Sequence, residues 1–273
     1  MITSPKNSRI KGAQKLLHKR YRTSEKLLLL EGVRLINDAL DSAVCPKLLF
    51  YAPDLIKKNS QAENLIARVE HMNIECVACT PAALVPLTKT VTPQGVVAVT
   101  ALPEDRLAPH VSLLLILDQV REPGNAGTLL RSAEAAGVEQ IIFAPNTVDP
   151  FNDKVLRGAM GAHFRLPISV CHTWEQLFLA LDKINLGSQH AYLAKSGNQL
   201  SYESVSWCEP SILIIGGEAD GASLEAQAWA TSISIPMIGK TESLNAAVAG
   251  SIILFEAARQ RRSCTNQVNP DNE

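Results

Sequence analysis

Apolar runs of strand length recur along the chain and alternate with stretches that have helical periodicity. The clearest runs are 27–30, 95–100, 111–117 and 211–215. Each is far shorter than the roughly 20 apolar residues that a membrane-spanning helix needs. Parallel strands are usually joined by crossover helices, so this alternation is typical of an α/β fold. The sequence therefore predicts an α/β protein with no membrane partner.

A proline-containing segment interrupts the alternation. Residues 101–110, ALPEDRLAPH, combine two prolines with charges of both signs and suit a linker. We therefore expect a smaller N-terminal domain over residues 1–100 and a larger domain over 111–262. A polar, flexible tail is expected over 263–273.

Cysteine and histidine usage indicates a cytoplasmic protein without a metal. The six cysteines are sparse, and their spacings suggest no disulfide framework. The N-terminus lacks the apolar core of a signal peptide. The six histidines are scattered, and no His, Cys and carboxylate cluster has metal-ligand spacing. Cys76 and Cys79 have the spacing of half a zinc site, but no second pair accompanies them.

The basic residues are concentrated at the N-terminal end, although the net charge of the chain is only −1. Residues 1–34 carry nine basic and two acidic residues, whereas the rest carries 17 basic and 25 acidic. This asymmetry predicts a polyanionic partner, with Lys15, Lys19 and Arg20 as candidate contacts on a helix that starts at Pro5. A solvated lysine-rich helix face explains the pattern equally well. Aromatic residues make up only 5 %, which argues against a base-stacking platform.

Three stretches at the ends of expected strands depart from regular strand and helix patterns. In 118–131, a strand leads through a Gly/Pro/Asn loop into a helix that carries Arg131, and a helix N-terminus with a fixed cation suits an anion. In 214–221, small residues allow a ligand to approach the backbone closely. In 235–245, a polar loop precedes an apolar helix that one of its residues could cap. Each stretch alone is also explained by turn chemistry.

Other nucleotide-binding classes lack their motifs. Gly239-Lys240-Thr241 is similar to the end of a phosphate-binding loop, but the first glycine of that motif would fall at Ser234, and Pro236 lies inside the stretch. A GxGxxG fingerprint is absent after every expected strand. An unrelated mononucleotide-binding enzyme is therefore not supported.

Taken in order, the three stretches resemble the signature motifs of the SpoU/TrmH branch of the SPOUT RNA methyltransferases. PGNAGTLLRSAEAAG is similar to the first motif, GGEADG to the second and IPMIGKTESLNAAVAGSIILFEAARQ to the third. Residues 148–168 resemble the family's connecting segment. EGVRLI and TPQGVVAV resemble the ribosomal-protein-like substrate-binding domain that many members carry. The resemblance covers residues 4–262, with small departures at Ala246-Ala247 and Gly158-Ala159.

The resemblance implies a C-terminal domain with a deep trefoil knot, a homodimer and S-adenosylmethionine as cofactor. The implied reaction is methyl transfer to a ribose 2′-hydroxyl of structured RNA, with rRNA favoured over tRNA. A non-catalytic RNA-binding protein on the same fold is a weaker alternative. The residues implied to surround the cofactor are Leu193, Gly216, Gly217, Ile235, Met237 and Leu244.

The catalytic residues implied by the same resemblance are Arg131, Asn125, Glu218, Ser243 and Asn245. The family gives Arg131 a central part, as the base or as an activator of the hydroxyl. Because arginine is effectively always protonated, a phosphate-binding role fits as well. Asn125 and Glu218 are expected to hold the loop geometry around Arg131. Ser243 and Asn245 are expected to orient the ribose or the neighbourhood of the cofactor.

Overall fold

The chain folds into two compact units, each with its own sheet. The first unit comprises Met1–Pro103 and Phe151–Phe164, and the second comprises Glu104–Pro150 and Arg165–Glu273. The structure is a computed structural model that describes residues 1–57, 59–197, 200–218 and 220–268.

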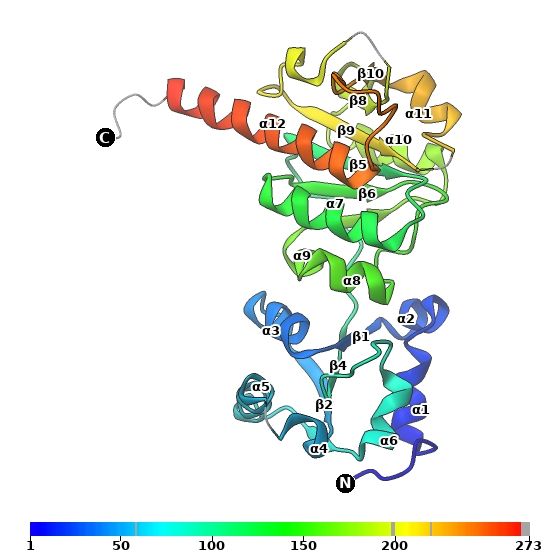
Figure 1. Ribbon diagram of the computed structural model, residues 1–273, viewed down its shortest axis with the longest axis vertical. Helices are drawn as coiled ribbons and strands as arrows, with labels where there is room; N and C mark the ends of the chain where they lie inside the picture. Colours follow the sequence, from blue (N-terminus) through cyan, green and yellow to red (C-terminus); the bar gives the residue numbers. More distant parts are fainter. Residues whose placement is uncertain (58, 198–199, 219, 269–273) are drawn as a thin grey trace. The chain divides into compact units, whose positions relative to one another are not determined.

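The first unit is built on a four-stranded sheet in the order β1-β4-β2-β3 (Figure 1). β4 runs antiparallel to β1 and β2, whereas β2 and β3 are parallel. Successive residues of a strand point to opposite faces, so Leu28 and Leu30 enter one core and Leu29 the other. The strands are β1 (Leu27–Glu31), β2 (Pro46–Tyr51), β3 (Cys76–Ala78) and β4 (Val96–Ala101).

Helices cover both faces of this sheet. Ile36 of α3 and Leu65 of α5 join the core of Leu28, whereas Ile10 of α1 and Ala83 of α6 join the core of Leu29. Figure 1 shows α3 and α5 on one side of the strands and α1 and α6 on the other. The helices up to this point are α1 (Ser8–Lys15), α2 (Lys19–Glu25), α3 (Val33–Asp41), α4 (Pro53–Ile56), α5 (Ser60–His71), α6 (Pro81–Leu84) and the 3-10 turn η1 (Val85–Leu87).

The single helix predicted from Pro5 to about Arg20 is wrong. Asn7 rather than Ser4 caps α1, with its side chain accepting from the backbone N–H of Arg9 at 2.9 Å. The helix ends at Lys15, and α2 begins at Lys19. A buried arginine from α2 donates to the carbonyls of the two residues that follow α1, Leu16 and Leu17.

Residues 151–164 join the first unit, although they follow the second unit's strand β6 in the sequence. They contain α8 (Asp153–Ala159), and α9 (Ala162–Arg165) begins there. Leu156 is 2 % exposed and belongs to the same core as Leu30 and Ile36. The range predicted for the C-terminal domain, 111–262, contains this segment.

The second unit is built on a six-stranded sheet in the order β10-β8-β9-β5-β6-β7, and every strand pair in it is parallel. The chain extends the sheet from β5 through β6 to β7 and then crosses to the opposite side of β5. Ligands of open parallel sheets bind at the carboxyl ends of strands near such a reversal. The strands are β5 (Leu113–Asp118), β6 (Gln140–Phe143), β7 (Ile168–Val170), β8 (Ala191–Ala194), β9 (Ser211–Gly216) and β10 (Thr231–Ile233).

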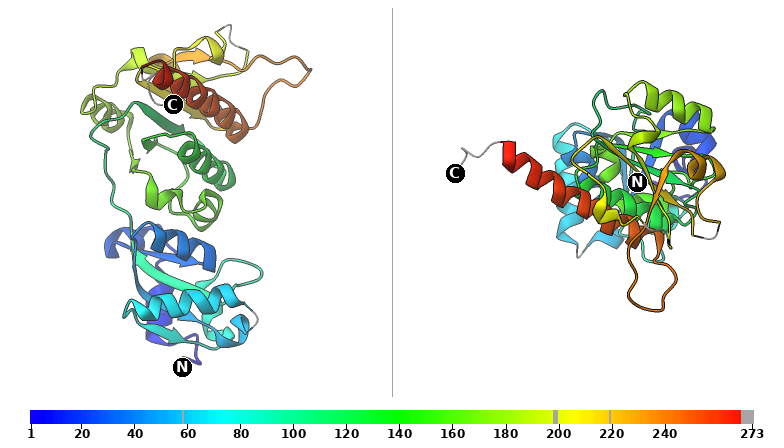
Figure 2. Two further views of the ribbon diagram at one scale, coloured as in Figure 1. Left: turned by 90° about the vertical axis from the view of Figure 1, so that its left-hand side faces the viewer. Right: turned by 90° about the horizontal axis from the view of Figure 1, so that it is seen from above.

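Two long helices, α7 (Pro123–Ala135) and α12 (Ala246–Val268), lie side by side on one face of this sheet (Figures 1 and 2). Gly250 permits this approach, because an added Cβ there would lie 2.4 Å from a methyl carbon of Leu129. The other face is covered by α10 (Trp174–Asp182) and α11 (Leu224–Trp229), which contribute to the core of Ile116 and Ile214.

The C-terminal end corrects two predictions. The helix expected to end at Arg262 continues to Val268, so part of the predicted flexible tail is helical. Cys208 and Cys264 form a disulfide, with their Cα atoms 6.5 Å apart, whereas no disulfide was expected. The two residues are 56 positions apart, and they meet because Gln260 of α12 accepts a hydrogen bond from the backbone of Trp207. The last predicted tail residues, 269–273, lie outside the described residues.

Within the described ranges, no helix is both long and apolar enough to cross a membrane. The same part of the chain contains no group of three or more His, Cys, Asp or Glu residues that could hold a metal ion.

Candidate active site

The loop from β5 into α7 is held in an unusual backbone conformation. Gln119 has a φ of 59°, which non-glycine residues seldom adopt. Its backbone N–H donates to the Thr147 hydroxyl at 2.9 Å, and this hydroxyl in turn donates to the Leu117 carbonyl at 2.8 Å. Pro123 then starts α7 at a position where its missing N–H costs nothing. The first turn of α7, which contains Asn125, is therefore fixed to the sheet.

Gly216 and Gly217 allow the end of β9 to lie against this loop. A Cβ on Gly217 would lie 2.3 Å from the Gln119 carbonyl oxygen, and a Cβ on Gly216 would lie 2.7 Å from the Ala222 nitrogen. Neither neighbour is the end of a flexible side chain, so both positions require glycine. The close approach expected from the sequence is thus made by the protein's own backbone.

A chain of amide hydrogen bonds connects all three motifs. Asn245 accepts from the backbone N–H groups of Ala247 and Val248 at 2.9 and 3.2 Å, and so caps α12. Its side-chain NH₂ donates to Asn125 at 3.0 Å, and Asn125 donates to Glu218 at 2.5 Å. The first stretch, 93 and 120 residues before the other two at these contacts, is thereby held in one arrangement with them.

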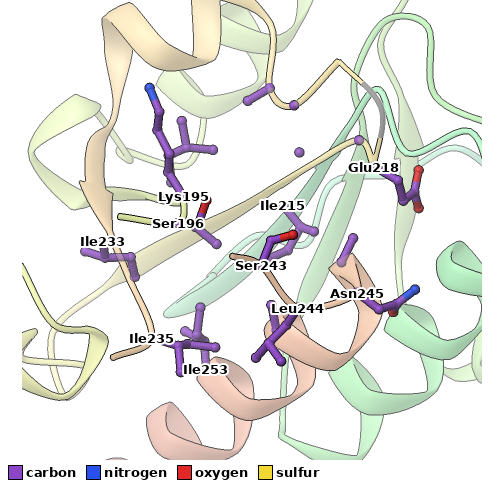
Figure 3. Close-up of a pocket in the computed structure, with 18 of the residues that line it drawn as sticks. Lys195, Ser196, Ile215, Glu218, Ile233, Ile235, Ser243, Leu244, Asn245 and Ile253 are labelled. Atoms are coloured by element: carbon purple, nitrogen blue, oxygen red, sulfur yellow. The ribbon is translucent and has the colours of Figure 1, made fainter. Parts of the chain in front are cut away.

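Beside this chain lies a cavity of about 610 Å³ at the carboxyl ends of β8 and β9. All six residues expected around the cofactor line it, as do Glu218, Ser243 and Asn245. Figure 3 shows Glu218 and Asn245 on one side of the cavity, with Lys195 and Ile233 on the other. Its other walls include the apolar side chains of Ile215 and Ile253, which the motifs do not single out.

A second hollow of about 440 Å³ adjoins the first and shares Glu218 and Asp220 with it. Asn125 lines this second hollow, and Arg121 forms a 2.8 Å ion pair with Asp220 at its edge. The shared carboxylates place the two hollows next to each other. A molecule in one could therefore contact a molecule in the other.

Asp118 lies buried below these residues. It is 0 % exposed, and one carboxylate oxygen accepts from the backbone N–H of Ser223 at 2.7 Å. The other oxygen has no hydrogen-bond partner among the described residues. Burial raises the pKa of Asp118 above its ordinary value, although the bonds from Ser223 oppose the shift. In the sequence, Asp118 is the single acidic residue that directly follows the apolar run 111–117, but the motifs did not indicate a role for it.

Arg131 is not brought to either hollow. It lies on the exposed surface of α7, and no hydrogen bond or ion pair joins it to the part of the chain that the structure describes. The next residue, Ser132, contacts Ser251 of α12 through their hydroxyl groups at 2.7 Å. Arg131 therefore presents a free cation next to the α7–α12 contact.

The predicted RNA-contacting residues Lys15, Lys19 and Arg20 are all exposed in the first unit. Two other cations of the basic N-terminal end are already engaged. Arg9 forms a two-point ion pair with Glu75, at 2.8 and 2.5 Å, and Arg22 is buried. The basic surface is consequently smaller than the sequence count suggests.

The second unit thus combines a parallel sheet, a strand end with two glycines and a cavity beside it. Residues 112–255 match the SpoU rRNA Methylase family, and residues 7–98 match the MRM3-like substrate binding domain. The chain belongs to the SpoU rRNA methylase family. This confirms the resemblance drawn from the three motifs, and also the α/β fold class with an N-terminal substrate-binding domain.

Among its relatives is the Bacillus subtilis 23S rRNA (guanosine(2553)-2'-O)-methyltransferase RlmP, which is 33 % identical over 93 % of this chain and 97 % of that protein. Human mitochondrial rRNA methyltransferase 3 is 31 % identical over 92 % of this chain and 72 % of that one. The solved structure of AviRb from Streptomyces viridochromogenes, in complex with AdoMet, has a TM-score of 0.80 and 29 % identity over 94 % of this chain and all of that one.

Proposed function

We propose that the protein transfers a methyl group from S-adenosylmethionine to a ribose 2′-hydroxyl of rRNA. The observation that carries the proposal is the cavity, which the second and third signature stretches line. The Asn245–Asn125–Glu218 hydrogen bonds connect the first stretch to both of them. The names of the relatives support the same reaction, because two of them act on rRNA and one on a guanosine 2′-oxygen.

S-adenosylmethionine fits the residues of the cavity. A volume of about 610 Å³ lies within the range of small-molecule sites. Ile215, Ile235 and Leu244 offer apolar surface for the adenine, and Lys195 and Ser196 offer donors for the carboxylate end. When bound, the cofactor supplies a methyl group on a positively charged sulfur, which is a strong electrophile.

The protein's part in the reaction is mainly alignment. Asn245 and Asn125 orient the Glu218 carboxylate at the boundary of the two hollows. There it accepts a hydrogen bond from the ribose hydroxyl and takes the hydroxyl proton when the oxygen is methylated. Ser243 orients the ribose from the other side of the boundary. Arg131 binds a phosphate of the RNA, because its guanidinium keeps its proton and its planar donors suit a phosphate.

We further infer a homodimer. Val248, Ile252 and Phe255 recur at helical spacing on α12 and are 49, 36 and 47 % exposed. A stripe of this kind on a 23-residue helix is suited to an isologous contact with a second copy. Arg131 lies on the neighbouring helix, so a dimer formed there would bring it near the partner's residues.

The trefoil knot that the family resemblance implies stays a prediction. Ser234 donates a backbone hydrogen bond to Leu200 and accepts one from Tyr202, at 2.9 and 3.0 Å. The chain then forms a long exposed loop, which projects outward in Figure 2, before it enters α12. The cytoplasmic location expected from the sequence stays a prediction, which fractionation of cells would test.

The direct test is methyl transfer to rRNA from cells that lack this protein. Labelled S-adenosylmethionine should label a single rRNA position, and nuclease mapping should place the label on a ribose 2′-oxygen. Protein with Asn125 replaced by alanine is the control for contaminating activity. Label on a base, or on tRNA alone, would contradict the proposal.

A further inference from the structure

The first half of α2 reverses the usual burial of side chains. Arg22 is 6 % exposed, whereas the neighbouring Tyr21 is 38 % exposed. Burial ordinarily favours the aromatic side chain and opposes the charged one. Packing alone therefore does not explain why the tyrosine faces water.

The buried arginine makes this segment rigid. Its guanidinium donates at 3.1 and 3.0 Å to the carbonyls of Leu16 and Leu17, which directly follow the last residue of α1. The backbone N–H groups of Tyr21 and Arg22 both donate to the His18 carbonyl, which closes the first turn of α2. The residues from Lys15 to Arg22, here called the elbow, thus hold a fixed shape.

The exposed tyrosine is surrounded by cationic and aromatic groups. The Lys15 ammonium lies 5.6 Å from the centre of the Tyr21 ring, in cation–π geometry. His18 approaches the same ring edge-on, with ring centres 6.5 Å apart. Lys19 and Arg20 are exposed next to it. Glu25, one turn further along α2, is the acidic residue of this helix.

An exposed aromatic ring beside exposed cations can bind both the base and the phosphates of an RNA nucleotide. A nucleobase stacks on an aromatic face whatever its sequence, and the neighbouring phosphates bind Lys or Arg. The Lys15 ammonium, now above the ring, would exchange that position for a phosphate when a base arrives. A paired base hides its faces within the duplex, so a base in a loop or bulge is required.

We propose that the elbow is a binding site for an unpaired RNA nucleotide, with the base stacked on Tyr21 and its phosphates bound by Lys15, Lys19 and Arg20. The inference rests on the proposed function in that the RNA is the methylation substrate. According to this inference, the first unit binds loops of folded RNA rather than regular duplex.

The test measures RNA binding without cofactor, by fluorescence anisotropy with a labelled oligouridine strand and an RNA duplex of equal length. Tyr21→Ala should weaken binding of the single strand about tenfold and leave duplex binding and the salt dependence unchanged, because stacking carries no charge. Tyr21→Trp should restore single-strand binding. Met72→Ala removes an exposed apolar side chain elsewhere in the same unit and should have no effect.

Equal losses for strand and duplex, or full affinity in Tyr21→Ala, would overturn the elbow site, as would failure of the unaltered protein to bind either RNA. Methyl transfer to rRNA is measured separately. Tyr21-dependent strand binding without any methyl transfer would contradict the proposed function alone. Normal methyl transfer with an unchanged KM for rRNA in Tyr21→Ala would contradict the elbow alone.

Discussion

At the scale of single residues, Gly217 is the position with the least freedom. A Cβ there would lie 2.3 Å from the backbone oxygen of Gln119, whose own strained conformation leaves it no room to move. We expect Gly217→Ala to lower S-adenosylmethionine affinity at least about tenfold, measured by calorimetry, while the protein stays folded by circular dichroism. Gly124→Ala is the control, because its nearest neighbour is a side-chain oxygen 3.8 Å away. Equal affinity in the two variants would contradict the assignment.

Asp118 makes stability depend on pH. Burial raises its pKa in the folded protein above the ordinary value of 3.8, so the folded state holds a proton that the unfolded state has already lost. The stability that this proton contributes is complete below the ordinary pKa and is lost as pH rises through the raised one. Asp118→Asn keeps an oxygen for Ser223 and removes the buried charge.

We therefore expect Asp118→Asn to be more stable than the unaltered protein at neutral pH, with the gap closing toward about pH 4. Urea unfolding at a series of pH values checks this. Asp182→Asn, at an exposed position of α10, should leave the profile unchanged. A variant less stable at every pH would mean that the carboxylate bond to Ser223 outweighs the cost of burial.

Substitution of Arg131 by lysine tests whether the arginine acts through its charge or through the geometry of its donors. Lysine retains the positive charge but not the planar pair of donors. We expect Arg131→Lys to keep cofactor affinity and to lose about a hundredfold in single-turnover methyl transfer, which corresponds to roughly 3 kcal/mol of barrier. Near-normal transfer would show that a positive charge is sufficient there.

At the scale of secondary structure, the helices α1 and α2 carry the cations that remain free for RNA. Each phosphate contact contributes somewhat under one unit to the slope of log affinity against log salt. Replacing Lys15, Lys19 and Arg20 by alanine should reduce that slope by about two units and leave cofactor affinity unchanged. Arg9→Ala is the matched control, since Glu75 already neutralises this arginine. An unaltered slope in the triple variant would return these helices to an ordinary solvated surface.

Local sequence patterns predicted which helices and strands form better than they predicted where these end or what they pack against. The apolar run 111–117 identified β5, and the expectation that a residue of the loop 235–245 caps the following helix is met by Asn245. The break between α1 and α2 was missed because it depends on Arg22, whose burial is a tertiary effect. The cavity walls Ile233 and Ile253 were missed for a similar reason, since an isoleucine in a motif does not differ from one in a core. The bond between Cys208 and Cys264 needed the packing of α12.

At the scale of the whole molecule, the exposed stripe on α12 predicts its assembly. A glutamate at position 255 would place a charge in the middle of an apolar interface, where burial without a partner is costly. We expect Phe255→Glu to shift the protein from dimer to monomer by light scattering. Leu179→Glu, at an exposed apolar position on α10, should leave the mass unchanged. A monomeric unaltered protein would contradict the homodimer.

The excursion of residues 151–164 into the first unit limits how such a protein can be rearranged in evolution. The chain passes between the units after Pro103, after Pro150 and after Phe164. A fragment ending at Pro103 would lose Leu156 from its core, and a fragment beginning at Glu104 would carry Leu156 without its cover. A single recombination breakpoint therefore cannot exchange the substrate domain. A new substrate domain can be inherited intact only if residues 151–164 are replaced together with it. The two separate parts of the gene that encode the first unit must therefore change together.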